Sequence, residues 1–143
     1  MEKRIENYFP KILDKTELIF KEEIKKGGIP SAYRGYISEF GSMVIQNGIL
    51  PALAYFEKED NNAEGERKKI VDVMKEFLIS EDIRFSKSSH RDKLVVIIKN
   101  MVKTNDSFNR DELRLIENKI IDISIALKLA MRTYLKVDNK EAD

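Results

Sequence analysis

A stretch of low charge, residues 31–56, constrains the fold of this chain more than any other part of its sequence. It reads SAYRGYISEFGSMVIQNGILPALAYF and carries only Arg34 and Glu39 as charged residues, in a chain in which 36% of the residues are charged. A segment so apolar must be mostly buried, either in the core or against a partner. Its large apolar residues recur at intervals of three and four, which is the helical period: Tyr33, Tyr36, Ile37, Phe40, Met43 and Val44.

A sharp turn and a second helix are predicted next. Gln46-Asn47-Gly48 is typical of a helix end, because glycine adopts the left-handed conformation that follows a last turn at little cost. Pro51 suits the first turn of the following helix, where its missing N–H would have no partner in any case. Gly41 lacks a side chain, so we expect a second backbone to approach the first helix closely there. These residues together predict a helical hairpin over residues 31–56.

An amphipathic helix is predicted before this hairpin. Its apolar residues follow the helical period from about Phe9, and Gly27-Gly28 is expected to end it. The helix could instead begin at Glu2, and Pro10 would then lie inside it and produce a kink, because proline interrupts the backbone hydrogen bonds of a helix interior.

Three more helices are predicted after the hairpin. Each start has a capping pair, namely Asn61 with Glu64, Ser89 with Asp92, and Asn109 with Glu112. The middle helix, residues 94–102, contains a β-branched run that would also suit a strand, but no other segment offers a strand partner, so we favour a helix. The last helix, from Arg110 to Lys136, would be about 40 Å long. Leu115, Ile125 and Leu129 widen its apolar stripe, so we expect it to contact neighbours on more than one side.

The expected fold is therefore all-α. We predict a single compact bundle of about six helices with a long C-terminal helix, formed by one domain of residues 1–143. The central helical hairpin would be its most buried part, and residues 138–143 would form a polar tail.

Several functional classes lack the residues that they need. The chain has no cysteine, and His90 is its only histidine, so we expect no metal site, no cofactor and no cysteine nucleophile. Ser88 and Ser89 precede His90, but adjacent residues at a helix start rarely point at each other, so we expect no enzymatic activity. The chain has no apolar run long enough for a membrane span and no apolar leader, which predicts a soluble protein of the cytoplasm.

Charge is distributed unevenly along the chain. The net charge is only +1, yet residues 57–83 sum to −4 and residues 84–110 to +5. Phe85 and His90 are interleaved with the basic residues, where a nucleic-acid base could stack, and only Asp92 and Asp106 are present in the segment to neutralise it. The segment predicts contacts with RNA phosphates, and a solvated basic face is the alternative. The candidate residues are Arg84, Lys87, Arg91, Lys93, Lys99 and Lys103.

Arg34 is a separate candidate for an RNA contact. It lies between Tyr33 and Tyr36 in an otherwise nearly uncharged helix, where its guanidinium could bind a phosphate or pair with Glu39. The alternative, which we favour on the residues alone, is an arginine whose aliphatic part covers the helix while its head group remains in water.

The central stretch also resembles a known family. The string IPSAYRGYISEFGSMVIQNGILPALAYFEK, residues 29–58, is similar to the small α-helical subunit of the Cmr complex, the type III-B CRISPR effector that cuts RNA. That family has a helix rich in tyrosine and basic residues, then a pair like Asn47-Gly48, a leucine and an Ala-Leu-Ala-Phe-like run. The run here comprises Leu50, Ala52, Leu53, Ala54, Tyr55 and Phe56. The segment ALKLAMR, residues 126–132, stands where relatives have a basic, tryptophan-containing helix end, although this chain has no tryptophan.

The resemblance implies a function in RNA-guided defence. A subunit of this kind would have no catalytic role, would stack beside the backbone subunits and neighbouring copies of itself, and would line the groove that holds guide and target RNA. It would bind RNA through phosphates, because base pairing reads the sequence. Arg132 would then join Arg34 and the basic segment as an RNA contact. Tyr33, Tyr36, Tyr55 and Phe56 would form the partner interface.

Two other functional classes remain as alternatives. The first is a purely structural interaction module that closes an assembly through its apolar hairpin and does not touch RNA. The second is a helical DNA-binding regulator, for which a basic recognition helix should follow the turn. The uncharged sequence PALAYF follows Gly48 instead, which disfavours the regulator.

Overall fold

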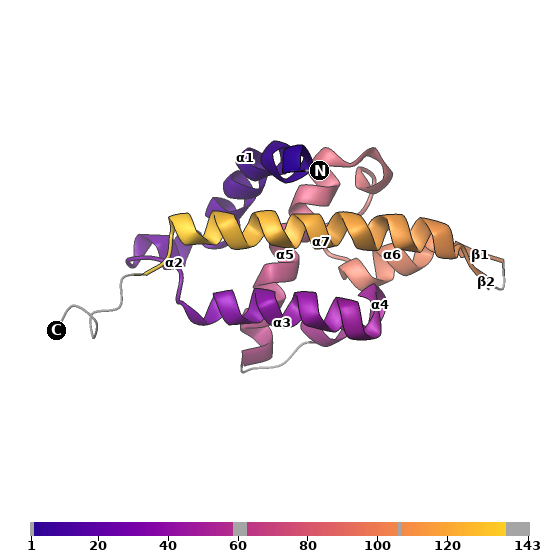
Figure 1. Ribbon diagram of the computed structural model, residues 1–143, viewed down its shortest axis with the longest axis horizontal. Coiled ribbons are helices and arrows are strands. Elements are labelled where there is room, and N and C mark those ends of the chain that lie inside the picture. Colours follow the sequence, from indigo (N-terminus) through magenta and orange to yellow (C-terminus); the bar gives the residue numbers. More distant parts are fainter. Residues whose placement is uncertain (1, 59–62, 106, 137–143) are drawn as a thin grey trace.

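A computed structural model describes residues 2–58, 63–105 and 107–136, and it confirms an all-α fold with a long C-terminal helix (Figure 1). Within these ranges only two strands occur, and each has two residues. The predicted capping pair Asn61 and Glu64 and the predicted tail 138–143 lie outside the part whose side chains are described. The elements are α1 (Glu2–Ile19), α2 (Lys21–Lys25), α3 (Ala32–Asn47), α4 (Ile49–Phe56), α5 (Ala63–Glu81), the 3₁₀ turn η1 (Ile83–Phe85), α6 (Leu94–Val102), β1 (Lys103–Thr104), β2 (Ser107–Phe108) and α7 (Arg110–Thr133).

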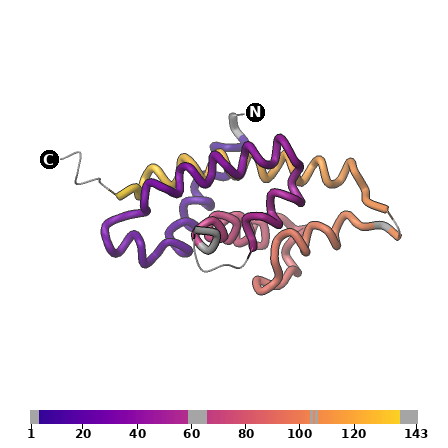
Figure 2. The backbone as a smooth tube through the Cα atoms, turned by 90° about the horizontal axis from the view of Figure 1, so that it is seen from below, coloured from indigo at the N-terminus to yellow at the C-terminus, as the bar shows by residue number. Residues whose placement is uncertain are grey.

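The helices form two layers. In Figure 1, α7 crosses the whole molecule between α1 on one side and α3 on the other, while α5 crosses behind it. Figure 2 shows the same arrangement from below, with α3 and α7 in one layer and α5 and α6 in the other. The β1–β2 hairpin extends from one end of the molecule, and α2 lies at the opposite end (Figure 1).

The central hairpin forms as the sequence predicts. Helix α3 ends at Asn47, Gly48 has a φ of +93°, and α4 begins at the next residue. The N–H of Gly48 donates to the carbonyl oxygen of Val44 at 2.8 Å, which completes the last turn of α3. The N–H of Ile49 donates to Oε2 of Glu117 on α7 at 2.9 Å, so a carboxylate distant in sequence caps α4.

The expected role of Gly41 is wrong. A Cβ atom added at Gly41 would meet no atom within 4 Å outside its own helical turns, so no second backbone approaches it. The close approach occurs at Gly28 instead, where an added Cβ would lie 2.7 Å from backbone atoms of Lys136 and Tyr134. This contact belongs to a backbone bridge in which the N–H of Ile29 donates to the carbonyl oxygen of Tyr134 at 2.7 Å.

The ends of two helices differ from the predicted ones. Helix α1 begins at Glu2 and contains Pro10, so the alternative start is correct and the start near Phe9 is wrong. Helix α7 ends at Thr133 rather than Lys136. The residues after it, 134–136, form a backbone bridge with Ile29 instead of continuing the helix. The predicted cap of α7 is confirmed, since the side chain of Asn109 accepts from the N–H of Glu112 at 3.0 Å.

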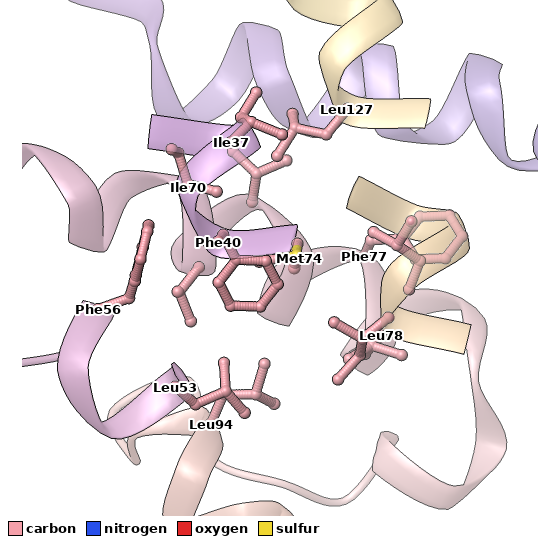
Figure 3. Close-up of a cluster of buried hydrophobic side chains, with 14 of the residues drawn as sticks. Ile37, Phe40, Leu53, Phe56, Ile70, Met74, Phe77, Leu78, Leu94 and Leu127 are labelled. Carbon is pink, nitrogen blue, oxygen red and sulfur yellow. The ribbon is translucent and has the colours of Figure 1, made fainter. Parts of the chain in front are cut away.

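One core joins the two layers. Figure 3 shows the side chains of α3, α4, α5, α6 and α7 that meet around Phe40, whose ring lies edge to face with that of Phe56 at a centroid distance of 5.1 Å. Leu115, Ile125 and Leu129 do not join this core, although they were expected to contact neighbouring helices. They stay exposed because α7 buries only the side that faces α1, α3 and the second layer.

Candidate nucleic-acid interface

The basic segment begins with a tightly anchored turn. Asp82 directly follows α5 and caps η1, and its Oδ1 accepts from the N–H of Arg84 at 3.0 Å. Phe85 follows and is fully buried, with 0% of its surface exposed. The expectation that Phe85 could stack on a base is therefore wrong, because the core already covers its ring.

A buried glutamate holds the start of α6. Glu57 is 2% exposed, and its carboxylate accepts from the N–H groups of Leu94 and Val95, the latter at 2.8 Å. Burial raises the pKa of Glu57 above its usual range, although the two N–H donors oppose that rise. The predicted capping box of Ser89 and Asp92 is wrong, since the hydroxyl of Ser89 instead accepts from the N–H of Arg91.

A buried lysine holds the preceding loop. Lys75 on α5 is 6% exposed, and its Nζ donates to the carbonyl oxygens of His90 and Asp92 at 2.9 and 3.0 Å. His90 is also held by its side chain, since Nδ1 lies 2.6 Å from Oε2 of Glu76. Glu57, directly after α4, and side chains of α5 thus fix loop 86–93 and the first turn of α6 against the bundle.

Arg84 is neutralised within the protein. Its guanidinium pairs with Asp82 at 2.9 Å and with Glu112 on α7 at 3.1 Å. Asp82 also accepts from Lys119 at 2.8 Å. Burial alone would raise the pKa of Asp82, but the hydrogen bonds from Arg84 and Lys119 outweigh burial and hold it well below the usual range.

The acids that compensate the basic segment come from outside it. Only Asp92 and Asp106 were expected to neutralise it, yet Glu76 of α5, Asp82 directly after α5 and Glu112 of α7 contact it. This expectation was wrong because Asp82 lies just before the segment, and because packing of α5 and α7 brings the carboxylates of Glu76 and Glu112 to it. Arg84 is consequently a structural residue as well as an RNA candidate.

Four of the six candidates in the basic segment are exposed cations that form no ion pair with a described residue. They occupy loop 86–93, α6 and the start of the β-hairpin. These four residues, which we call the exposed basic set, are Lys87, Arg91, Lys99 and Lys103. Lys93 differs, because it is half-buried and has an interaction of its own.

Arg34 and Arg132 lie elsewhere. Helices α3 and α7 are antiparallel, as contacts at both ends of α3 and between Ser38 and Lys128 show. This register places Arg34 and Arg132 at the same level, and both are exposed. Arg132 follows Arg110 by 22 residues of α7, or about 33 Å along the helix axis. The structure therefore divides the predicted RNA contacts between the two ends of α7.

Two of the four aromatic residues predicted for the partner interface lie in the core. Tyr33 and Phe56 are buried, so they stabilise the fold and offer no ring to a partner. Tyr36 and Tyr55 are half-buried under Arg67, whose Cζ lies 4.8 and 5.9 Å from the two ring centroids. The sequence reasoning missed Arg67, because it precedes the apolar stripe of α5 and resembles a solvated charge.

Arg67 also determines the environment of Arg34. Its Nε donates to Oε1 of Glu39 at 2.8 Å, and Glu39 is the acid with which Arg34 could have paired. Among the described residues Arg34 has no ion pair, and it is exposed. Its guanidinium therefore extends into solvent, as an RNA contact would require.

An apolar groove separates α3 from α7. It has a volume of about 240 Å³. Gly41, which lacks a side chain, and Ser124, whose side chain is small, are among its lining residues and leave this space unfilled. Ile45 borders the groove and is 79% exposed. Its remaining lining residues are Ile37, Ser38, Ile121, Ile125 and Lys128.

Neither a metal centre nor a membrane helix is found in the described ranges. No group of three or more His, Asp or Glu residues there could hold a metal ion. No described helix is long and apolar enough to cross a membrane.

Comparison with known proteins identifies a family. The family model described as "CRISPR-associated protein (Cas_Cmr5)" matches residues 14–118, which include the helical hairpin and the basic segment. No curated protein and no solved structure matches the chain. The matched range covers well over half of the 143 residues. The chain therefore belongs to the Cas_Cmr5 family, the small subunit of the type III-B CRISPR effector complex Cmr.

Proposed function

We propose that this subunit is non-catalytic and helps to hold guide and target RNA inside the Cmr complex. Family membership makes the chain a component of that complex. The RNA contact is supported by one observation above all, the exposed basic set on a loop and helix that Glu57 and Lys75 fix in place. Cations that are already positioned bind a phosphate chain at a lower entropic cost than cations on a mobile loop.

Arg34 and Arg132 extend this proposal to the other end of α7. The length of α7 places two cationic regions about 30 Å apart on one subunit, which suits a ligand that runs along the molecule. The chain would stack beside the backbone subunits and other copies of itself, so that these regions line a continuous path. No step of RNA cleavage is assigned to it.

The test removes three charges that no described residue neutralises. The triple variant Lys87→Ala, Arg91→Ala and Lys99→Ala should fold normally, because all three side chains are exposed. In the assembled complex, each lost phosphate contact should reduce the log–log salt slope of RNA binding by about 0.7. Binding should weaken equally for all sequences, since phosphates carry no base information. Equilibrium binding of target RNA at several salt concentrations measures both effects.

A matched control removes the same charge elsewhere. Lys21, Lys25 and Lys26 are exposed in and directly after α2, which lies at the end of the molecule opposite the β-hairpin, and their triple alanine variant should leave the salt slope unchanged (Figure 1). If the basic variant assembles into the complex and binds RNA with the slope of the wild type, the basic segment has no RNA contact.

A second candidate function rests on the groove between α3 and α7. Ile45 borders it and is 79% exposed, and Ile125, which also lines it, is 44% exposed. Leu129, one turn further along α7, is 41% exposed. Exposed apolar residues gathered beside a groove are typical of a protein contact. A purely structural module would use this groove to join a neighbouring subunit without touching RNA.

The substitution Ile45→Ser distinguishes the structural module from the RNA-holding function. Ile45→Ser should change the free energy of unfolding by less than about 0.5 kcal/mol, because the side chain is already exposed. If the structural module is correct, this variant should fail to enter the complex while the basic triple variant enters it and binds RNA normally. Co-purification with tagged partner subunits measures the incorporation.

A further inference from the structure

A second cleft lies at the end of the bundle, beside the β-hairpin. It has a volume of about 330 Å³, at the lower end of the range of small-ligand sites. Leu50 of α4 and Leu113 of α7 form its apolar lining, and Ser107, Phe108 and Arg110 complete it. Three elements, α4, β2 and α7, thus converge on one small concave surface.

Phe108 is exposed in this cleft although it is a large aromatic residue. Its exposed fraction is 48%, and it lies on β2, directly before the cap residue of α7. The N–H of Asn109 donates to the carbonyl oxygen of Val102 at 2.7 Å, which closes the hairpin onto the end of α6. Asn105 adopts a left-handed conformation with a φ of 55° in the turn. The ring is therefore held by a short, hydrogen-bonded hairpin rather than by core packing.

Two cations accompany the ring. Lys103 is the direct cross-strand partner of Phe108, so their side chains share one face of the hairpin. Arg110 lines the cleft together with Phe108. Neither cation forms an ion pair with a described residue, and Glu112, an acid on the first turn of α7, is already paired with Arg84. Asp111 is the exposed acid of that turn, so among the described residues the two cations outnumber it.

We propose that this cleft binds one base of single-stranded RNA, with the base stacked on Phe108 and the flanking phosphates held by Lys103 and Arg110. An aromatic face beside cations is the arrangement that stacks bases without reading their sequence. A protein partner would explain an exposed phenylalanine but would not require two unpaired cations beside it. The inference rests on the proposed RNA-holding function and adds a stacking site to its phosphate contacts.

The experiment separates stacking from apolar contact. The full-length protein and the assembled complex are titrated with a fluorescently labelled oligouridine and an oligoadenosine of equal length. Phe108→Ala should weaken binding about tenfold or more, while Phe108→Trp should preserve or strengthen it. Phe108→Leu keeps an apolar side chain without a ring, so it should behave like alanine. The salt slope should be unchanged in all three, because stacking releases no counterions.

A substitution of Arg110 tests the phosphate contact of the same cleft. Arg110→Ala should reduce the salt slope by about 0.7 and leave the preference between the two oligonucleotides unchanged. Lys21→Ala is the matched control on an exposed lysine of α2 at the opposite end of the molecule, and it should change neither (Figure 1).

The results show whether the cleft binds a base or a protein partner. If Phe108→Leu and the wild type bind RNA equally, stacking is excluded. If Phe108→Ala leaves RNA affinity unchanged and prevents incorporation into the complex, the cleft is a protein interface and the proposal is wrong. These variants leave Lys87, Arg91 and Lys99 intact. Loss of the stacking site can therefore be distinguished from loss of the phosphate contacts of the basic segment, which the triple variant of those three residues tests.

Discussion

Gly48 and Gly41 are seven residues apart in the sequence, and only Gly48 has a backbone conformation that favours glycine. Gly48 has a φ of +93°, in a region that residues with a Cβ rarely adopt, whereas Gly41 lies within helix α3. Neither position is crowded, since the nearest atoms to an added Cβ at Gly48 are 3.9 Å away and none lies within 4 Å at Gly41. An alanine at either position would therefore act through the backbone conformation and not through steric overlap.

The first prediction concerns this pair. Gly48→Ala should destabilise the protein by about 1 kcal/mol or more, because alanine resists the positive φ. Gly41→Ala should instead stabilise it by about 0.5–1 kcal/mol, since alanine is the better helix former. Urea denaturation of both variants measures the difference. Equal effects of the two substitutions would show that the turn at residue 48 does not require glycine.

The second prediction concerns Asp82. Its carboxylate accepts from Arg84 and Lys119, and Asp82→Asn should reduce the free energy of unfolding by about 2 kcal/mol at pH 7. The pKa of Asp82 is lowered in the folded state, so its contribution is complete above the unfolded pKa of about 4 and declines as the pH falls towards the folded value. The difference between wild type and variant should therefore shrink between pH 7 and pH 3.

An exposed aspartate is the control for Asp82. Asp14→Asn makes the same chemical change on the surface of α1 and should alter stability by less than about 0.5 kcal/mol. A difference for Asp82→Asn that stays constant down to pH 3 would contradict the assignment of its ion pairs.

At the scale of elements, two short helices depend on carboxylates from elsewhere in the chain. Helix α4 has 8 residues and α6 has 9, lengths at which a helix is not stable alone in water. Glu117 of α7 caps the first of them, and Glu57, which follows α4, caps the second. Each cap also joins two elements, so helix formation and packing stabilise each other.

The third prediction follows from the cap of α6. Glu57→Ala leaves the N–H groups of Leu94 and Val95 without partners in a buried place, which should cost about 2 kcal/mol or more. Glu57→Gln should cost less, because its amide oxygen can still accept one bond. Chemical denaturation gives both values, and amide hydrogen exchange should show faster exchange in α6 for the alanine variant. Equal stability of the alanine variant and wild type would remove Glu57 as the cap.

At the scale of the whole molecule, one cluster of buried residues connects both layers. It includes residues of every helix except α2, and we expect the chain to unfold as a single domain. Calorimetry should show one transition with an enthalpy of about 100 kcal/mol near 60 °C. This value should equal the van't Hoff enthalpy, as two-state unfolding requires. Two resolved transitions would show that the layers fold independently.

The charge distribution also belongs to this scale. The acidic segment and the basic segment adjoin in sequence, and in the structure Asp82 and Glu76 of the first contact Arg84 and His90 of the second. Compensation is nevertheless incomplete, because the exposed basic set forms no ion pair with a described residue. The net charge of +1 thus conceals a surface that is locally basic.

The sequence alone determined the all-α class and the long C-terminal helix, though not the exact helix ends, as well as the turn at Gly48, the cap at Asn109 and the family resemblance. These features depend on neighbouring residues, since helical period, positive φ and N-capping are local properties. The cap of α6, the neutralisation of Arg84 and the burial of Phe85 were decided by the tertiary structure. Each depends on residues brought together from distant segments, such as Glu57 with Leu94 and Arg84 with Glu112. No sequence period encodes such pairs, because packing of the helices fixes which carboxylate meets which partner.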